Sequence, residues 1–395
     1  MRRRIDMGRY AVVAIGYNRP LGMKRLLETL EKADYEDDDV TLIVSIDNSG
    51  ESGVEDCARA FSWTHGAKRI VTYPQRLGLR SHILKCGDFL QDYDAVAVFE
   101  DDLIAAPGFY SYMKAAVAKY ADDDRIAGIS LYSRHWNTNV GKPFDPSPSA
   151  YDVYFWQHAE SWGQIWMKKQ WAAFVSWYRQ NEGDWVDSEE LPEFVCSWPD
   201  TSWLKYHVKY CVETNKYFVC PYVSLTTCYS DPGQHTPYQT AYLHVPMLYG
   251  VKRDYRLPDL SDGDVVVYDV FFERDLGRVA KLSLRDEVCV DIYGSKRNHQ
   301  RYRYILSMDG LPYRAIRSFG LQMRPHEDNV IYGVEGKGIY LYDRTQTDTG
   351  KQRKKDGAEE FRYRFRIYGP IKQLVCCVWE QILSRCKLKW KKKKD

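Results

Sequence analysis

The chain has 395 residues, with 56 lysines and arginines against 54 aspartates and glutamates and a formal net charge of +2. This near balance excludes the broadly basic surface that nucleic-acid binding requires. The length favours one large catalytic domain with an appendage. Ten cysteines without C-x-x-C pairs or Cys-His zinc spacing favour a reducing, cytoplasmic environment over a disulfide scaffold. The first apolar run, residues 11–15, is too short for a signal peptide or a membrane span.

The first 130 residues alternate between predicted strands and predicted helices. Strands are predicted at 10–17, 40–47, 68–74, 95–99 and 125–132, and helices at 20–33, 54–62, 79–90 and 108–120. Continuously apolar strands that alternate with helices are typical of an α/β fold, in which a parallel sheet is covered on both faces. Ligands of such sheets bind at the carboxyl ends of the strands.

Polar residues follow four of these strands directly. They are Asn18-Arg19, Asp47-Asn48, Gln75-Arg76 and Glu100-Asp101-Asp102. We expect all four sets to meet at one edge of the sheet, because the carboxyl ends of parallel strands lie together. The dinucleotide fingerprint G-x-G-x-x-G is absent after the first strand, where IGYNRPLG stands instead, and this disfavours a Rossmann dehydrogenase.

From residue 133 to 250 the sequence is rich in tryptophan and in loop-forming residues. Residues 133–149 predict a loop, and residues 154–177 run through Ser161-Trp162-Gly163 into a helix. A second helix is predicted at 197–213, opened by Pro199, followed by a strand and a polar loop at 218–236.

After residue 250 the pattern changes again. DVVVYDVFF, EVCVDIYG, RYRYILSMDG, NVIYGV and GIYLYD predict strands of a small β or α+β module. We therefore expect a catalytic domain at 1–250, a strand-rich accessory module at 251–350 and a basic linker with an amphipathic helix at 351–395. That helix, at 371–394, ends in a lysine cluster and predicts either a contact with an anionic membrane surface or a helix docked on the protein's own core.

The stretch VAVFEDDLIAAPGF, residues 96–109, carries the strongest chemical signal. A buried strand that runs into three carboxylates costs free energy unless a cation meets them. Mg²⁺ and Mn²⁺ prefer oxygen ligands and often lie between one or two carboxylates and the phosphates of a nucleotide. The alternative is that these residues cap the following helix or face solvent. Asp47, after the second strand, either accepts hydrogen bonds from a nucleotide or forms an ordinary Asp-Asn turn.

Taken together, these motifs resemble the GT-A glycosyltransferases over residues 9–245. The resemblance is carried by YNRP after the first strand, Asp47, EDD followed by PGF, and SWGQIW before a tryptophan-rich helix. It is nearest to bacterial family 2-like transferases of polysaccharide clusters and more distant to the Golgi N-acetylglucosaminyltransferase I type, which also has a Glu-Asp-Asp variant of the D-x-D motif. It implies a GT-A (Rossmann-like nucleotide-diphospho-sugar transferase) fold.

The activity that this resemblance implies is metal-dependent, inverting transfer of a hexose or N-acetylhexosamine in bacterial surface polysaccharide synthesis. The donor is a nucleotide-diphosphate sugar, foremost a UDP-sugar, with Mn²⁺ or Mg²⁺ as cofactor. The acceptor is a glycan or a lipid-linked glycan. The expected location is the cytoplasm or, if the helix at 371–394 binds lipid, the inner face of the cell membrane.

The resemblance also implies roles for individual residues. Asp102 holds the metal that bridges the donor diphosphate, and His235, in a loop over the diphosphate, ligates the metal or donates to a phosphate oxygen. Asp101 and Glu100 contact the ribose and the donor sugar. The remaining nucleotide contacts are assigned to Asp47, Tyr17, Asn18, Arg19 and Arg80. For Arg80 the alternative is an ordinary surface arginine.

An inverting transfer needs a base that removes the proton of the acceptor hydroxyl. Asp200, in SWPDTSWLKY, matches the acidic segment of the family and is the candidate base, with Asp184 and Asp187 as substitutes. The alternative for Asp200 is a helix cap beside Pro199. Trp162 and Trp203 are candidate acceptor-stacking surfaces, or else core residues.

Two other functions stay open at this point. A nucleotidyltransferase also uses paired carboxylates and Mg²⁺, although YNRPLG lacks the glycine-rich loop usual in that class. A non-catalytic scaffold that binds a sugar or a nucleotide is the other alternative.

Overall fold

The computed structural model describes residues 8–183, 185–229, 243–278, 287–348 and 357–366, together with Val375 and Trp379. The chain divides into two compact units, one up to Arg353 and one from Lys354. In the second unit the described residues form the helix α9 (Gly357–Phe365), which the sequence did not predict. Apart from Val375 and Trp379, the helix predicted at 371–394 lies outside the described residues.

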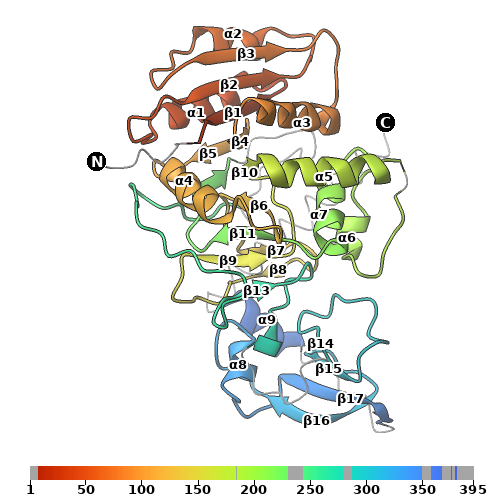
Figure 1. Cartoon of the computed structure of the whole chain (residues 1–395). Coiled ribbons are helices and arrows are strands. Elements are labelled where there is room, and N and C mark those ends of the chain that lie inside the picture. The colour runs from red at the N-terminus through yellow and green to blue at the C-terminus, as the bar shows by residue number, and fades with distance from the viewer. Residues whose placement is uncertain are drawn as a thin grey trace. The chain divides into compact units, whose positions relative to one another are not determined.

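A nine-stranded sheet forms the centre of the first unit (Figure 1). Its order is β13-β9-β11-β6-β10-β4-β1-β2-β3. The strands are β1 (Tyr10–Gly16), β2 (Thr41–Ile46), β3 (Lys68–Thr72), β4 (Ala95–Glu100), β6 (Ile126–Ser130), β9 (Val153–Trp156), β10 (Gln164–Met167), β11 (Tyr217–Pro221) and β13 (Val267–Tyr268). The strands β1 to β4 are parallel, and β10 is antiparallel between β4 and β6. The predicted α/β fold is confirmed.

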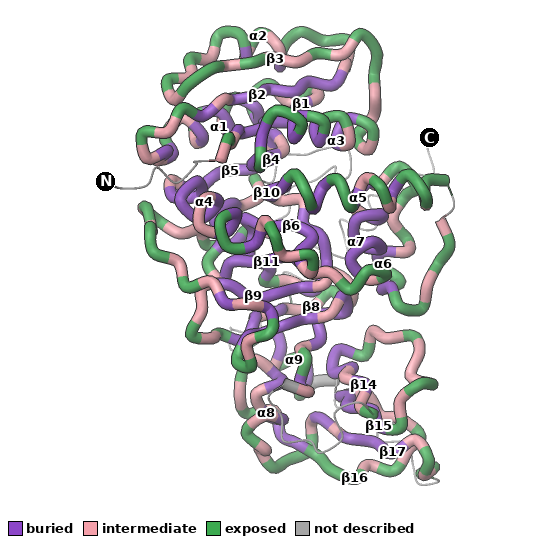
Figure 2. The backbone as a smooth tube through the Cα atoms, in the orientation of Figure 1, coloured by how far each residue is buried: buried purple, intermediate pink, exposed green. Residues whose placement is uncertain are grey.

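Helices cover both faces of this sheet. They are α1 (Pro20–Glu31), α2 (Gly53–Ala60), α3 (Leu79–Gly87), the 3₁₀ helix η1 (Asp88–Gln91), α4 (Phe109–Tyr120), α5 (Lys168–Asn181), α6 (Glu193–Cys196) and α7 (Trp203–Glu213). Alternate residues of β1 belong to two different apolar clusters, one with α1, α2 and α4 and the other with α3, α5 and α7. The strands are therefore buried on both sides, as the purple core of Figure 2 shows.

Several short strands were not predicted. The strand β5 (Leu103–Ala105) follows the acidic cluster and pairs antiparallel with β12 (Thr226–Cys228). The strand β10 stands directly before α5, and β7 (Trp136–Asn137) pairs with β8 (Lys142–Pro143) inside the predicted loop. Each has two to four residues, which is too short for a periodic pattern to emerge from the sequence.

Four strands after residue 287 form a separate sheet in the order β14-β15-β17-β16. They are β14 (Val288–Val290), β15 (Tyr304–Ser307), β16 (Tyr313–Phe319) and β17 (Ile339–Thr347). Of the predicted strands, DVVVYDVFF contributes β13 to the large sheet instead, and the 3₁₀ helix η2 (Leu276–Arg278) follows it. The prediction of a strand at NVIYGV is wrong, because the helix α8 (Asp328–Ile331) covers the first half of this segment. The Asn329 side-chain oxygen there accepts from the backbone N–H groups of Gln322 and Met323, a contact with the preceding loop that strand propensity does not include.

Two features of the described residues concern disulfide bonds and membrane spans. The seven cysteines among the described residues are all unpaired. Within the same residues, no helix has the length and apolar character needed to cross a bilayer.

His207, on α7, is a buried imidazole without a hydrogen bond. Both ring nitrogens lack a partner, and the ring stacks on Phe174 at a centroid distance of 4.0 Å. Burial lowers its pKa from 6.5 to about 3, so the folded protein holds the ring neutral. The unfolded chain binds this proton near pH 6.5, whereas the folded protein binds it only near pH 3. The free energy of unfolding therefore decreases as the pH falls from 6.5 towards 3.

We expect His207→Phe to reduce this acid sensitivity. Each pH unit between the two pKa values is equivalent to about 1.4 kcal/mol. The change in unfolding free energy caused by the substitution should therefore be about 2–3 kcal/mol more favourable at pH 4.5 than at pH 7.5. Urea denaturation at both pH values measures this difference, with the half-exposed His135→Gln as the matched control. Equal effects of His207→Phe at the two pH values would contradict the prediction.

Candidate active site

The acidic cluster lies where β4 ends and turns into β5. The β5–β12 pairing places Leu103 opposite Cys228, and the Tyr229 N–H donates to the Asp102 carbonyl at 2.6 Å. Two backbone elements far apart in sequence therefore fix the turn that carries Glu100, Asp101 and Asp102. Backbone hydrogen bonds to a distant segment therefore hold the end of the predicted strand.

Arg19 is the cation that meets this cluster. Its guanidinium forms an ion pair with Asp101. Both of its terminal nitrogens also lie 3.2 Å from Asp102 Oδ2. Arg19 immediately precedes α1, which begins at Pro20. A Cβ on Gly22 would lie 2.4 Å from the Asp101 carbonyl oxygen, so only glycine lets the first turn of α1 approach the acidic turn.

One guanidinium does not compensate three carboxylates. Burial, with Asp102 and Asp101 adding to it, raises the pKa of Glu100 to about 8. Burial also raises the pKa of Asp101 to about 6, although the neighbouring Arg19 opposes the shift. Asp102 Oδ1 is buried and has no hydrogen-bond partner. The site is consequently short of positive charge and has one free carboxylate oxygen.

These residues fit a divalent cation only in part. Within the described ranges, no group of three or more His, Cys, Asp or Glu side chains is arranged to hold a metal. Asp102 Oδ1 offers one oxygen of the kind that Mg²⁺ and Mn²⁺ prefer, so other ligands have to come from a bound molecule, from water or from outside these ranges. The predicted ligand His235 lies outside the described residues.

Asp47, at the end of β2, is buried and holds the loop that precedes α3. Its Oδ1 accepts from the Leu77 N–H at 2.7 Å, and its Oδ2 accepts from the Gly78 N–H at 2.9 Å. Gly78 has a φ of +79°, a conformation that favours glycine. Asp47 is thus more than a local Asp-Asn turn, because it connects the ends of two strands through this loop.

We expect Asp47→Ala to lower the unfolding free energy by about 2–3 kcal/mol, because the partly buried N–H groups of Leu77 and Gly78 lose a charged acceptor. Nucleotide affinity should fall as well, since the loop loses its anchor. Urea denaturation and nucleotide titration measure the two effects. Asp56→Ala, which removes only an exposed bond from Ser52, is the control and should cost less than about 1 kcal/mol. Equal stability of the two variants would contradict the role of Asp47.

The ends of β1 and β3 meet at the same edge. The Arg76 guanidinium lies 5.1 Å from the centre of the Tyr17 ring. With the Arg19 and Asp47 contacts, all four polar sets predicted to converge have a member in this region.

Arg80 and Asp200 lie together. Arg80 Nη1 donates to the Asp200 carbonyl at 2.7 Å, so α3 connects the Asp47 loop to the candidate base. The Asp200 side chain is 85% exposed and lies 3.3 Å from Lys205 Nζ. The helix α7 begins at Trp203, not at 197, and Ser202 is its N-cap. The alternative role of Asp200 as a helix cap is therefore wrong, and Arg80 is not an isolated surface arginine.

Three of the other candidates lie within the described residues. Asp187 accepts from Trp185 Nε1 at 2.8 Å, and Asp184 lies outside the described residues. Trp203 is buried in the core, so it offers no acceptor surface. Trp162 is half-buried, with the Arg134 guanidinium 4.5 Å from its ring centre.

Sequence reasoning missed a buried ion pair beside the acidic cluster. Arg134 binds Glu160 through two hydrogen bonds of 3.0 Å, and both residues are at most 5% exposed. The pKa of the Cys228 thiol is raised to about 12, by burial first, then by Asp102 and Glu100, with a smaller effect of Glu160. The charges of both groups therefore act on the Cys228 thiol. The polar stretch HAES between two apolar strands was the available signal.

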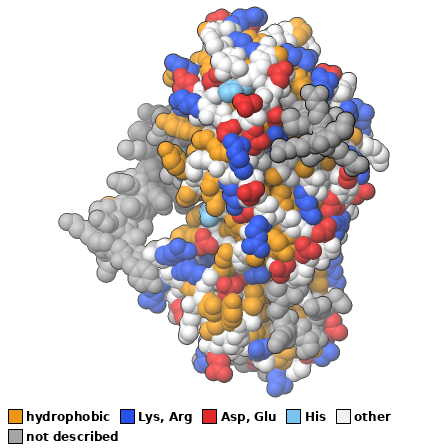
Figure 3. Space-filling model, turned by 60° about the vertical axis from the view of Figure 1, so that its left-hand side comes forward, with side chains coloured by type: hydrophobic (Ala, Val, Ile, Leu, Met, Phe, Trp, Pro, Cys, Tyr) orange, Lys and Arg blue, Asp and Glu red, His pale blue; other side chains and the backbone are white. Residues whose placement is uncertain are grey.

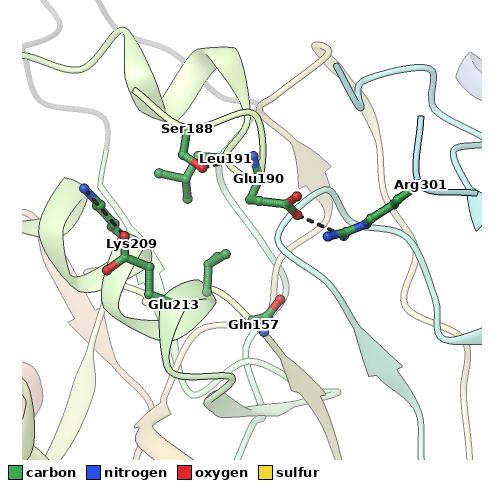
Figure 4. A pocket seen from close by; sticks show the side chains of 8 residues that line it. Gln157, Ser188, Glu190, Leu191, Lys209, Glu213 and Arg301 are labelled. Carbon is green, nitrogen blue, oxygen red and sulfur yellow. Dashed lines mark hydrogen bonds and ion pairs between the residues drawn. The ribbon is translucent and has the colours of Figure 1, made fainter. Parts of the chain in front are cut away.

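A separate pocket of about 400 Å³ is lined by Ser188, Lys209 and Arg301 among others (Figure 4). Arg301 pairs with Glu190 at 3.0 Å, and Lys209 lies 3.6 Å from Glu213. None of the predicted site residues lines it. On the face that Figure 3 shows, acidic and basic side chains are interspersed, in keeping with the small net charge.

Comparison with known proteins gives only weak likenesses. No protein-family model matches the chain, and no curated protein matches it. The mannosyltransferase PcManGT from Pyrobaculum calidifontis, solved with GDP-Man and Mn²⁺, is 15% identical, with a TM-score of 0.34 over 55% of this chain and 57% of that one.

S. aureus TarS 1–349 is 14% identical, with a TM-score of 0.35 over 56% of this chain and 60% of that one. The TarS complex with UDP-GlcNAc is 13% identical, with a TM-score of 0.36 over 58% and 60%. This chain thus spans 57–60% of the length of these solved structures. Likeness at this level assigns no activity by itself.

Proposed function

We propose that the protein is a metal-dependent, inverting glycosyltransferase. It moves a sugar from a nucleotide-diphosphate donor to a glycan or lipid-linked glycan acceptor in polysaccharide synthesis. The observation that carries this proposal is the unpartnered Asp102 Oδ1, in a three-carboxylate cluster with one arginine, at the end of a central parallel strand. A parallel sheet places ligands at that edge.

The carboxylates have distinct tasks in this proposal. Asp102 holds Mn²⁺ or Mg²⁺, which when bound offsets the charge of the leaving diphosphate. Asp101 and Glu100 bind hydroxyl groups of the ribose and the donor sugar. Burial, together with Asp102 and Asp101, raises the pKa of Glu100 to about 8, so Glu100 is mostly protonated at neutral pH and can donate a hydrogen bond as well as accept one.

The nucleotide side of the site is formed by the loops after β1 and β3. In this proposal Asp47 orients the loop at residues 75–79, Tyr17 and Asn18 contact the base, and Arg80 pairs with a phosphate. Two hydrogen bonds support this part of the proposal, one from the Leu77 N–H to Asp47 and one from Arg80 to the Asp200 carbonyl.

Asp200 is the proposed base. Its exposed carboxylate takes the proton of the acceptor hydroxyl while the hydroxyl oxygen attacks the anomeric carbon and the bond to the diphosphate oxygen breaks. The electron pair of that bond leaves with the nucleoside diphosphate. The helix predicted at 371–394 is proposed to bind a lipid surface, because its lysine cluster favours an anionic membrane. Flotation on anionic liposomes tests that last role, with a chain ending near residue 368 as the control.

A screen of nucleotide sugars tests the function. UDP-GlcNAc, GDP-mannose and related donors are added with and without Mn²⁺, and the melting temperature is recorded. We expect one donor to raise it only when Mn²⁺ is present, with slow release of nucleoside diphosphate. Pyrophosphate release from a nucleoside triphosphate would instead indicate a nucleotidyltransferase, and absence of any metal-dependent shift would contradict the proposal.

A further inference from the structure

The Arg19 guanidinium binds the carboxylate of Asp102, which is the proposed metal ligand. Both of its terminal nitrogens lie 3.2 Å from Asp102 Oδ2, and one also pairs with Asp101. Asp102 therefore has one oxygen engaged by a cation and one buried oxygen without a partner. A divalent ion that binds the free oxygen would stand within a few ångströms of the guanidinium, and the two positive charges would repel each other.

We propose that Arg19 restrains metal binding until the donor is present, so that metal and nucleotide bind cooperatively. This inference rests on the proposed function, because it takes Asp102 as the metal ligand. In the nucleotide-free protein Arg19 partly neutralises the cluster and lowers its attraction for a free cation. Arg19 thus acts as a positioning residue that couples two ligands.

The diphosphate gives Arg19 a second partner. The Arg19 side chain is 25% exposed, so it is not locked inside the core. Phosphate oxygens bind a guanidinium as well as a carboxylate does, through paired hydrogen bonds. When the diphosphate arrives, Arg19 can turn to it and release Asp102. By thermodynamic linkage, the factor by which nucleotide strengthens metal binding equals the factor by which metal strengthens nucleotide binding.

Electron paramagnetic resonance of free Mn²⁺ tests this coupling without any measurement of turnover. The wild-type protein, Arg19→Gln and Asp102→Asn are titrated with Mn²⁺ at pH 8, with and without UDP, and protein-free UDP corrects for chelation. For Arg19→Gln without nucleotide we expect Mn²⁺ binding about fivefold or more tighter than in the wild type. The enhancement by UDP should shrink by the same factor.

Two further variants keep the test decisive. Lys24→Gln removes an exposed positive charge from α1, the helix that follows Arg19, without touching the acidic cluster, and it should leave Mn²⁺ binding unchanged. If Arg19→Gln does not fold, Arg19→Lys replaces it. A lysine is too compact to span both carboxylates, so binding about twofold tighter is expected.

The outcomes separate the two proposals. Unchanged or weaker nucleotide-free Mn²⁺ binding in the Arg19 variants, with binding still lost in Asp102→Asn, overturns the role of Arg19 alone. Full Mn²⁺ binding by Asp102→Asn overturns the metal site and with it the proposed function.

Discussion

Asp102→Asn is expected to lower Mn²⁺-dependent release of nucleoside diphosphate from the donor by about a thousandfold. The asparagine is nearly isosteric, but it replaces one carboxylate oxygen by an amide that donates hydrogen bonds and carries no negative charge. It thus removes the proposed metal ligand with little change in volume. A coupled assay of the released diphosphate measures turnover, and it needs no knowledge of the acceptor because water can take the sugar.

The matched control for this variant is Asp92→Asn. Asp92 is an exposed carboxylate just before β4, paired with Arg69 at 3.6 Å on the surface. Its removal should change turnover by less than about twofold, because exposed pairs contribute little. Full activity of Asp102→Asn in a correctly folded protein would end the assignment of Asp102.

Asp200→Asn should lower turnover by about a hundredfold or more, while the affinity for the donor changes by less than about twofold. The asparagine cannot accept the proton, but the nucleotide pocket is untouched because Arg80 binds the Asp200 main-chain carbonyl and not its carboxylate. Calorimetric titration with the donor and steady-state kinetics separate the two effects.

Asp187→Asn is the corresponding control, since Asp187 was the substitute candidate in the described part of the loop. We expect it to retain turnover. If Asp187→Asn loses activity while Asp200→Asn keeps it, the base lies in the loop before α6 and the placement at Asp200 is wrong.

The parts of the fold that were predictable are those with long local signals. Five apolar strands alternating with four amphipathic helices indicated the α/β sheet, and the acidic residues after β4 indicated where chemistry would lie. The rule that parallel strand ends converge was sufficient to anticipate that Arg19 and Asp102, which belong to different loops, lie at the same edge of the sheet.

What was missed depends on contacts between distant segments. The strand that pairs with β5 lies more than a hundred residues away, so the short segment LIA alone carried no strand signal. Ser202, rather than Asp200, caps α7, because the helix begins after the turn that Pro199 opens. The Arg134–Glu160 pair is visible only after two loops are brought together.

The most direct test of the account is a crystal structure with Mn²⁺ and UDP, in which anomalous scattering locates the metal. The account predicts a manganese peak coordinated by the Asp102 carboxylate and the diphosphate, with Arg19 moved away from Asp102. A nucleotide bound elsewhere, or a peak that Asp102 does not contact, would contradict it.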